Sequence, residues 1–149
     1  KEHEIVVRVA LNRGAARAAV AAGLHAGTDV TGFSLAGHAH EMAERSGVAV
    51  HIVAADVPLL PMAREHAAAG AVPGGTGRNR AHFVDGGRVA LGDLDPAVAD
   101  LMLDPQTSGG LLLGVPAGHA ADWDRARAAE GVTAWRIGEV RAGTGVRIG

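Results

Sequence analysis

Hydrophobic positions along the chain follow a helical spacing in some stretches and a strand-like spacing in others. Helical spacing covers residues 4–22, with Ile5, Val9, Ala16 and Val20 on one side. It returns over residues 33–45 and stops at Gly47, a residue type that commonly ends helices. Alternating or continuous apolar runs predict strands at residues 48–53, 88–91, 111–115, 132–140 and 144–148.

Capping residues and prolines predict the remaining helices. Asp56, with Pro58 and Pro61 shortly after it, predicts a helix over residues 56–70, because an acidic cap and early prolines are typical helix starts. Asp95 before Pro96 predicts a short helix to about Leu101 in the same way. A helix is also expected over residues 117–129, and residues 85–88 read as a turn.

Helices and strands follow one another without a strict βαβ repeat. This order predicts an α+β fold, with a mixed, largely antiparallel sheet covered by helices. The chain has 149 residues and shows no internal repeat or linker, so residues 1–149 are expected to form a single domain. It begins Lys-Glu-His-Glu and not with Met, which favours a piece of a longer protein.

Composition excludes several classes of function. Aromatic residues make up only 3% of the chain and the formal net charge is −2, so neither base-stacking platforms nor a basic surface for nucleic acid is expected. No apolar run is long enough to span a bilayer, and no membrane partner is expected. Without cysteine the chain has no thiol nucleophile or disulfide, which agrees with a cytoplasmic protein.

Polar, glycine-bearing residues gather in three stretches at element boundaries. These are residues 28–38, a turn that presents Asp29; residues 72–79, a glycine-rich loop too flexible for regular structure; and residues 104–110, a turn before a strand. If the stretches meet at one end of the sheet they form a phosphate or metal site. The sequence leaves open whether they meet, and neither a P-loop nor a Gly-x-Gly-x-x-Gly fingerprint is present.

Each candidate residue also has a structural interpretation. Asp29 lies before a predicted helix, where a carboxylate can hold a cation or simply cap the helix. His38 and Glu41 could share a zinc ion, but a packing or loop-bracing role for His38 is favoured, since His38 and His40 point to different sides of a helix. Ser108 lacks the Gly-x-Ser-x-Gly context of a nucleophile, and Asp104 before Pro105 reads first as a turn former.

Five motif blocks taken together resemble a known family, the C-terminal domain of selenophosphate synthetase (selenide, water dikinase), within the aminoimidazole ribonucleotide synthetase-like superfamily. The match spans nearly the whole chain, and Asp-Pro-Gln-Thr-Ser-Gly-Gly and Thr-Asp-Val-Thr-Gly-Phe are its most specific blocks. The blocks are residues 27–33, 35–47, 58–61, 73–79 (Pro-Gly-Gly-Thr, then Arg78 and Asn79) and 104–112.

The resemblance implies an enzyme that uses ATP, Mg²⁺ and selenide to make selenophosphate and that dimerises mainly through N-terminal domains. By the family's motif, Asp29 would join N-domain aspartates in holding Mg²⁺ on the ATP phosphates. The family's catalytic lysine and cysteine or selenocysteine lie in an N-terminal segment that is expected to be absent here. The resemblance therefore implies no catalytic residue in this chain and an inactive isolated domain, and it assigns no role to Arg78, Asn79 or His38.

Two residues depart from the family pattern Gly-Phe-Gly-Leu-Leu-Gly-His, in which this chain has Ser34 and Ala36. If the glycine provides a positive φ, Ser34 alters the local geometry, and a tolerated change is expected. Two alternatives stay open at this point. One is a free-standing, non-catalytic domain that binds a phosphate ligand or a protein; the other is a different synthetase or kinase of the superfamily, which the Asp-Pro-Gln-Thr block argues against.

Overall fold

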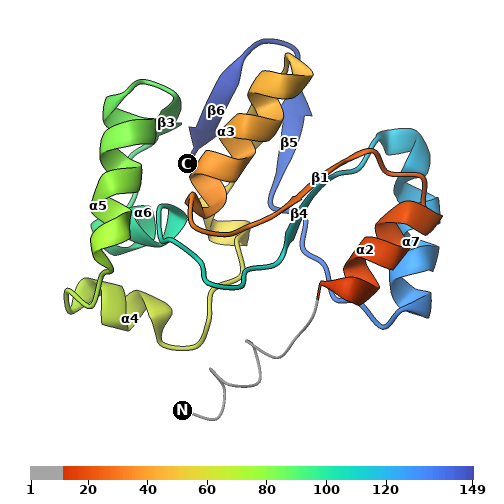
Figure 1. The fold of residues 1–149 in the computed structure, drawn as a ribbon, viewed down its shortest axis with the longest axis horizontal. Coiled ribbons are helices and arrows are strands. Elements are labelled where there is room, and N and C mark those ends of the chain that lie inside the picture. Colours follow the sequence, from red (N-terminus) through yellow and green to blue (C-terminus); the bar gives the residue numbers. More distant parts are fainter. Residues whose placement is uncertain (1–11) are drawn as a thin grey trace. The chain divides into compact units, whose positions relative to one another are not determined.

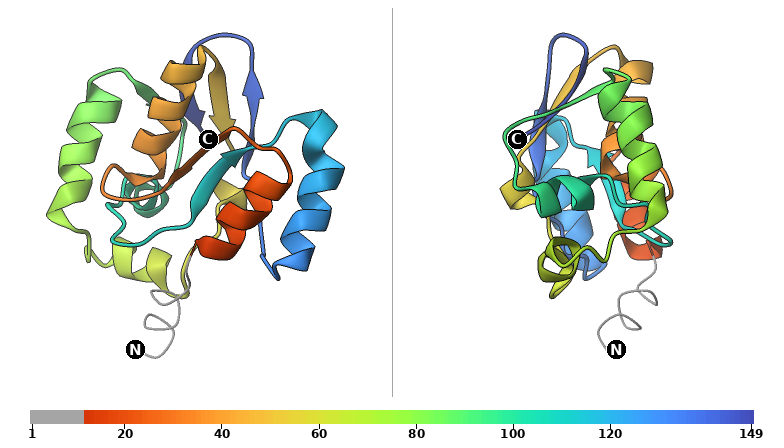
Figure 2. Two further views of the ribbon diagram at one scale, coloured as in Figure 1. Left: turned by 45° about the vertical axis from the view of Figure 1, so that its right-hand side comes forward. Right: turned by 90° about the vertical axis from the view of Figure 1, so that its left-hand side faces the viewer.

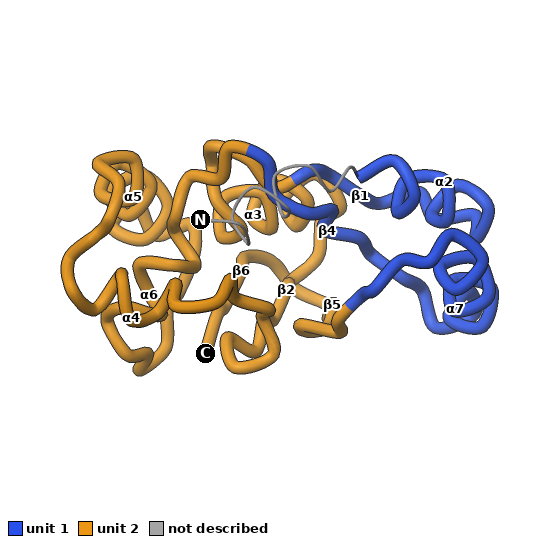
Figure 3. The backbone as a smooth tube through the Cα atoms, turned by 90° about the horizontal axis from the view of Figure 1, so that it is seen from below, with its two compact units in different colours: residues 1–29, 108–134 blue, residues 30–107, 135–149 orange. Residues whose placement is uncertain are grey.

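A computed structural model describes residues 12–149, and these residues form two compact units (Figures 1 and 3). Unit 1 contains the described residues up to Asp29 together with Ser108–Ala134. Unit 2 contains Val30–Thr107 and Trp135–Gly149. The prediction of a single domain over residues 1–149 stays a prediction.

Unit 1 is a helix pair with a two-stranded antiparallel ribbon. Helix α2 contacts α7, and β1 pairs with β4 so that Asp29 lies opposite Leu111. Its small core is built from alanines of the α2 region (Ala18, Ala19, Ala22). The elements are α2 (Arg13–Ala21), β1 (Ala26–Asp29), β4 (Leu111–Gly114), a 3₁₀ turn (Ala117–His119) and α7 (Ala120–Ala129).

Unit 2 is a mixed sheet with the order β3-β6-β2-β5 and with helices packed on it. Strand β2 pairs antiparallel with β5 and parallel with β6, and β6 pairs parallel with β3. Helix α3 packs against β6 and β2 (Figure 2). The elements are α3 (Ser34–Ser46), β2 (Ala49–Ile52), a 3₁₀ turn (Ala54–Asp56), α4 (Ala63–Ala68), α5 (Gly74–Asn79), a π-helical segment (Arg80–Asp85), β3 (Val89–Leu91), α6 (Pro96–Met102), β5 (Gly138–Arg141) and β6 (Gly145–Ile148).

The core of unit 2 lies between α3 and the sheet. Small alanines on one side of α3 let the helix approach closely, and Val146 and Ile148 of β6 are buried while Arg147 between them is exposed. Met102 and Leu103 at the end of α6 are also buried. Gly47 ends α3 with a left-handed φ of 63°, as its position in the sequence predicts.

The predicted α+β class with mixed strand pairing is confirmed. So are the helix that ends at Gly47, the helix capped by Asp95, and the strands near residues 48–53, 88–91, 111–115 and 144–148. The helix predicted over residues 4–22 is observed as α2, and residues 4–11 lie outside the described part. No helix among residues 12–149 is long and apolar enough to cross a bilayer.

One helix prediction was wrong in its start, and one loop prediction was wrong in kind. The helix expected to open at Asp56 begins only at Ala63, because the proline that follows Val57 disfavours helical backbone there, and Val57 is extended. Residues 72–79 were predicted to be a flexible loop, yet Gly74–Asn79 is helical and continues into the π-helical segment. Close packing explains the glycines there, since a Cβ on Gly75 would lie 2.6 Å from Pro105 Cγ.

Two other boundaries also differ from the predictions. Thr28 and Asp29 are the last residues of β1, so the predicted turn over residues 28–38 begins only after them. The strand predicted over residues 132–140 is limited to Gly138–Arg141, because residues 132–137 carry the chain from unit 1 to unit 2. Gly138 permits the close approach of β2: a Cβ there would meet the His51 carbonyl oxygen.

Candidate functional site

The three motif stretches meet within unit 2, and Asn79 joins two of them. Its Nδ2 donates hydrogen bonds to the carbonyl oxygens of Gly32 and Leu103, both at 3.0 Å. Asn79 is only 7% exposed, so this amide is held inside the protein. A side chain at the end of α5 therefore fixes the backbone before α3 and the backbone after α6.

The third stretch is tied to the first through Gln106. The Gln106 backbone N–H donates to the Thr31 carbonyl oxygen at 3.1 Å, and its Nε2 donates to Asp104 Oδ2 at 2.6 Å. Burial raises the pKa of Asp104, and the hydrogen bond from Gln106 partly offsets this rise. The Asp104 carboxylate is thus partly buried and hydrogen-bonded to Gln106. A residue that only forms a turn needs neither feature.

Glycine residues, which have no side chain, allow these stretches to approach one another closely. Gly75 lies against Pro105, and a Cβ on Gly37 would be 2.5 Å from the ring of Phe83 in the π-helical segment. We call the set of Thr31, Gly32, Asn79, Asp104 and Gln106 the motif junction. It answers the question that the sequence left open, since parts of all three stretches do come together.

His38 braces the first stretch, as the sequence favoured. Its Nε2 lies 3.0 Å from Thr31 Oγ1, and its ring lies 5.8 Å from that of Phe33. Nδ1 lies 3.5 Å from Glu41 Oε2, so these two side chains form a pair without a third metal-ligating residue beside them in the described part of the chain. Among residues 12–149 no three His, Cys, Asp or Glu side chains come together as a metal site would need.

Ser34 adopts the conformation that a glycine would favour. Its φ is +68°, in the left-handed region, and the residue is fully buried at the start of α3. Its Oγ accepts a hydrogen bond from the Gly37 N–H at 3.4 Å and donates to the Phe33 carbonyl. The hydroxyl makes local bonds while the backbone keeps the glycine-like turn, and the expectation of a tolerated change stays a prediction.

Arg78 is exposed beside Gly74 and Gly75 of α5 and forms no ion pair with the described residues. Its Nη2 would lie 3.6 Å from a Cβ on Gly75, which places the guanidinium over the glycines. A guanidinium with open donors suits a carboxylate or a phosphate. The structure therefore separates the neighbours: Asn79 faces inward to support the backbone and Arg78 faces outward.

Asp29 belongs to unit 1. It is an exposed residue at the end of β1, and its carboxylate forms no hydrogen bond or ion pair with the described residues. It lines an open hollow together with Asn12, His25 and Thr28. A carboxylate of this kind can supply one oxygen ligand to Mg²⁺, and that ligand would be a carboxylate oxygen of Asp29.

Sequence reasoning missed the support role of Asn79 and the helix that carries it. A signal was present: Thr76, Asn79 and Phe83 are buried and recur at helical spacing. The four glycines around residues 70–77 obscured it. Ser108, the other candidate considered, is exposed in unit 1, and no hydrogen bond of its hydroxyl involves the described residues.

The arrangement of helices and mixed strands, with the motif junction at their ends, defines the class of protein. The sequence matches the family described as AIR synthase related protein, C-terminal domain, over residues 7–149. The chain therefore belongs to this family. A solved structure of thiamine-monophosphate kinase from Stenotrophomonas maltophilia K279a shares the fold, with a TM-score of 0.53, 23% identity and coverage of 84% of this chain and 31% of that one.

Several curated proteins that are similar to this chain are selenide, water dikinases. Those from Nitratidesulfovibrio vulgaris strain DP4 and Cronobacter sakazakii are 42% and 41% identical and match 87% and 95% of this chain. The Bordetella bronchiseptica protein is 51% identical over 74% of the chain. The match takes in 37%, 40% and 31% of these three relatives' own lengths, in the same order as named. The predicted resemblance to the selenophosphate synthetase C-terminal domain is confirmed.

Proposed function

We propose that this chain acts as the C-terminal domain of a selenide, water dikinase, which makes selenophosphate from selenide, ATP and water. The observation that carries the proposal is the 41–51% identity to proteins of that name. The motif junction supports it, because the family-specific blocks form one hydrogen-bonded unit. ATP, Mg²⁺ and a homodimeric, cytoplasmic enzyme belong to the same proposal.

Asp29 is proposed as a ligand of the Mg²⁺ that accompanies ATP. Its exposure and lack of a protein partner leave the carboxylate available, and hard oxygen ligands suit this ion. Bound Mg²⁺ would neutralise charge on the phosphate oxygens during phosphoryl transfer. Because one carboxylate is a poor magnesium site, the other ligands would come from the N-terminal ATP-binding domain.

The motif junction has a supporting role within unit 2. Asn79 and Gln106 fix the backbone at residues 31, 32 and 103 through three hydrogen bonds to carbonyl oxygens. Arg78, exposed beside this support, is available to an anion. Positioning of this kind is the larger part of what a protein contributes to phosphoryl transfer, because the metal and substrate carry the chemistry.

The first test replaces Asp29 in a full-length enzyme that carries this domain. Asp29→Asn should abolish selenide-dependent ATP turnover and leave the circular dichroism spectrum unchanged, because the side chain is exposed. Asp93→Asn, another exposed aspartate, is the matched control and should keep normal turnover. Near-normal turnover by Asp29→Asn would contradict the metal assignment.

A second test concerns the need for the other domain. We expect no selenide-dependent ATP hydrolysis by this chain with Mg²⁺ alone, and activity after it is mixed with a separately expressed N-terminal domain. Absence of both activity and association in the mixture would favour the alternative, a non-catalytic domain of the same superfamily that binds a phosphate ligand or a protein.

A further inference from the structure

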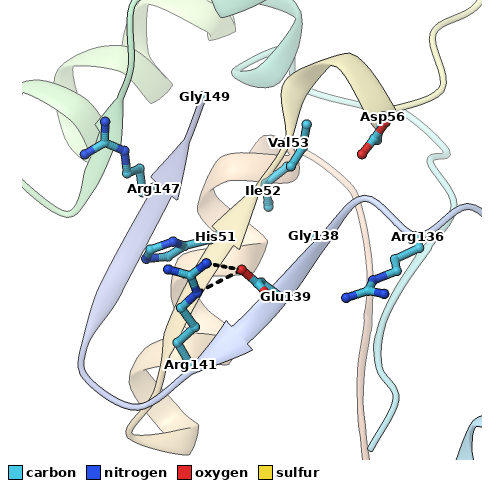
Figure 4. A pocket seen from close by; sticks show the side chains of 10 residues that line it. All are labelled: His51, Ile52, Val53, Asp56, Arg136, Gly138, Glu139, Arg141, Arg147 and Gly149. Atoms are coloured by element: carbon cyan, nitrogen blue, oxygen red, sulfur yellow. Dashed lines mark hydrogen bonds and ion pairs between the residues drawn. The ribbon is translucent and has the colours of Figure 1, made fainter. Parts of the chain in front are cut away.

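The face of the unit 2 sheet that presents Arg147 carries a row of polar side chains across three strands (Figure 4). His51 on β2 lies directly opposite Arg147 on β6 and directly opposite Glu139 on β5. Directly paired residues point to the same side of a sheet. Because Val146 and Ile148 are buried on the other side, this row lies on the face that the core does not use.

Arg141 adds to this row from β5. It lies two residues beyond Glu139, on the same face, and its Nε donates to Glu139 Oε1 at 2.8 Å. This hydrogen bond, followed by the charge of Arg141, lowers the pKa of Glu139, and the charges of Arg136 and His51 act in the same direction. Basic groups from β2, β5 and the segment before β5 therefore surround one carboxylate.

Around these residues lies an open hollow of about 620 Å³, and three arginines line it: Arg136, Arg141 and Arg147. Arg141 is paired with Glu139, whereas Arg136 and Arg147 form no ion pair with the described residues. The remaining acid in the hollow is Asp56. The overall composition shows no excess of basic residues, so it is the strand register that gathers positive charge at this place.

We propose that this hollow binds an anion with two or more phosphate groups. Guanidinium groups present planar pairs of donors that match phosphate oxygens. Arg141 lies opposite Ala49 and Arg147 opposite His51 on the two sides of β2, so their backbones are about 12 Å apart by the usual strand spacing and rise. A linked pair of phosphates suits this separation better than a single one.

The residues that line the hollow also indicate which part of a ligand is recognised. They include no phenylalanine, tryptophan or tyrosine, so a nucleotide base finds no aromatic ring to stack on. The site would then recognise the phosphate groups alone, and inorganic pyrophosphate is the smallest ligand that contains them. The proposal is independent of Asp29 and of selenide turnover.

Isothermal titration of the 149-residue chain with inorganic pyrophosphate, in magnesium-free buffer, tests the proposal. We expect measurable binding that weakens with added salt, and about a tenfold loss of affinity for each of Arg136→Gln and Arg147→Gln. Arg125→Gln is the matched control: Arg125 is exposed on α7 in unit 1 and is paired with Asp122. It removes the same charge and should leave the affinity unchanged.

Three results would overturn the proposal: no binding by the wild-type chain, equal affinity in the double variant Arg136→Gln/Arg147→Gln, or an equal loss in Arg125→Gln. Titration with ADP and with a hexaglutamate peptide completes the test. ADP binding as tightly as pyrophosphate supports recognition of the phosphates alone, and much tighter ADP binding contradicts it. Hexaglutamate binding as tightly as pyrophosphate would show a general anionic surface and would also contradict the phosphate site.

Discussion

Ser34 shows how one residue can keep a backbone conformation that its side chain disfavours. An L-residue in the left-handed region costs roughly 1–2 kcal/mol, and Ser34 has a φ of +68°. Its hydroxyl compensates in part through bonds to neighbouring backbone groups. The backbone strain comes from the Cβ at a positive φ, and the compensation comes from the hydroxyl. Substitutions that remove the hydroxyl with or without the Cβ can therefore separate the two effects.

We predict that Ser34→Gly is more stable than Ser34→Ala by about 1 kcal/mol, because both lack the hydroxyl and only alanine keeps a Cβ at a positive φ. Urea denaturation, followed by circular dichroism, gives the free energies of unfolding. Equal stability of the two variants would mean that the turn relaxes to a negative φ when the hydroxyl is removed.

Asp104 predicts a specific dependence of stability on pH. Burial raises its pKa above the ordinary value of 3.8, so the folded state binds the proton more tightly than the unfolded state does. The contribution of Asp104 to stability is therefore present at low pH and is lost as the pH rises from 3.8 through the folded-state pKa. Above that range the charged, partly buried carboxylate lowers the free energy of unfolding.

Asp104→Asn removes this titration and keeps an oxygen that can accept from Gln106. The stability of the variant relative to the wild type should therefore be greater at pH 7 than at pH 4, as measured by urea denaturation at each pH. Asp100→Asn, which instead breaks an ion pair with Arg80, is a control and should show no such gain at pH 7. A relative stability of Asp104→Asn that is the same at both pH values would contradict the assigned burial effect.

At the scale of elements, Asn79 is the link between α5 and two other segments. Asn79→Leu keeps the approximate size of the side chain but leaves the Gly32 and Leu103 carbonyl oxygens without their donor. We predict a loss of about 2–4 kcal/mol in the free energy of unfolding, because unpaired buried carbonyls are costly.

The neighbouring Arg78→Gln is the matched control for Asn79→Leu, since Arg78 is exposed. Its free energy of unfolding should stay within about 0.5 kcal/mol of the wild type. If Asn79→Leu were as stable as Arg78→Gln, the two hydrogen bonds would not hold the motif junction together.

Elements with local signals could be predicted from the sequence, and elements that depend on distant contacts could not. Asp95 caps α6 through its own neighbours, Ala97 and Val98, and Gly47 ends α3 by its own φ. Helix α5 has no capping residue of this kind, and its glycines, which disfavour helices, obscure the spacing of Thr76, Asn79 and Phe83. The packing of Gly75 on Pro105 and the hydrogen bonds of Asn79 account for its form.

The candidate site follows the same division. Motif blocks identified the stretches and His38 as a brace, because residue types and spacing suffice for that. The assignment of Asp29 to magnesium rests on the resemblance and stays a prediction. The gathering of Arg147, His51 and Glu139 depends on strand register, which joins residues almost a hundred positions apart and leaves no local pattern.

At the scale of the molecule, the two units differ in how much they bury. Helix α7 has no buried residue, and the core of unit 1 is mainly alanine, which removes little apolar surface from water. Unit 2 buries Met102, Leu103, Phe83 and Ile148. The exposed ion pair of Arg17 with Glu130 adds little to unit 1, because such pairs are screened by solvent.

We therefore predict that backbone amides of α2 and α7 exchange with deuterium faster than those of α3 and α6 in the isolated chain, since local opening costs less where little is buried. Hydrogen exchange followed by mass spectrometry measures this directly. Equal protection in all four helices would indicate that the chain opens as one cooperative unit.

The two hydrogen bonds of Asn79 end on main-chain oxygens and not on side chains. Every amino acid at positions 32 and 103 presents such an oxygen, so the connection does not depend on which residues occupy those positions. In a library of all single substitutions, position 79 should tolerate almost no replacement on account of this connection. The residue types at positions 32 and 103 could change over evolutionary time without any compensating change at position 79.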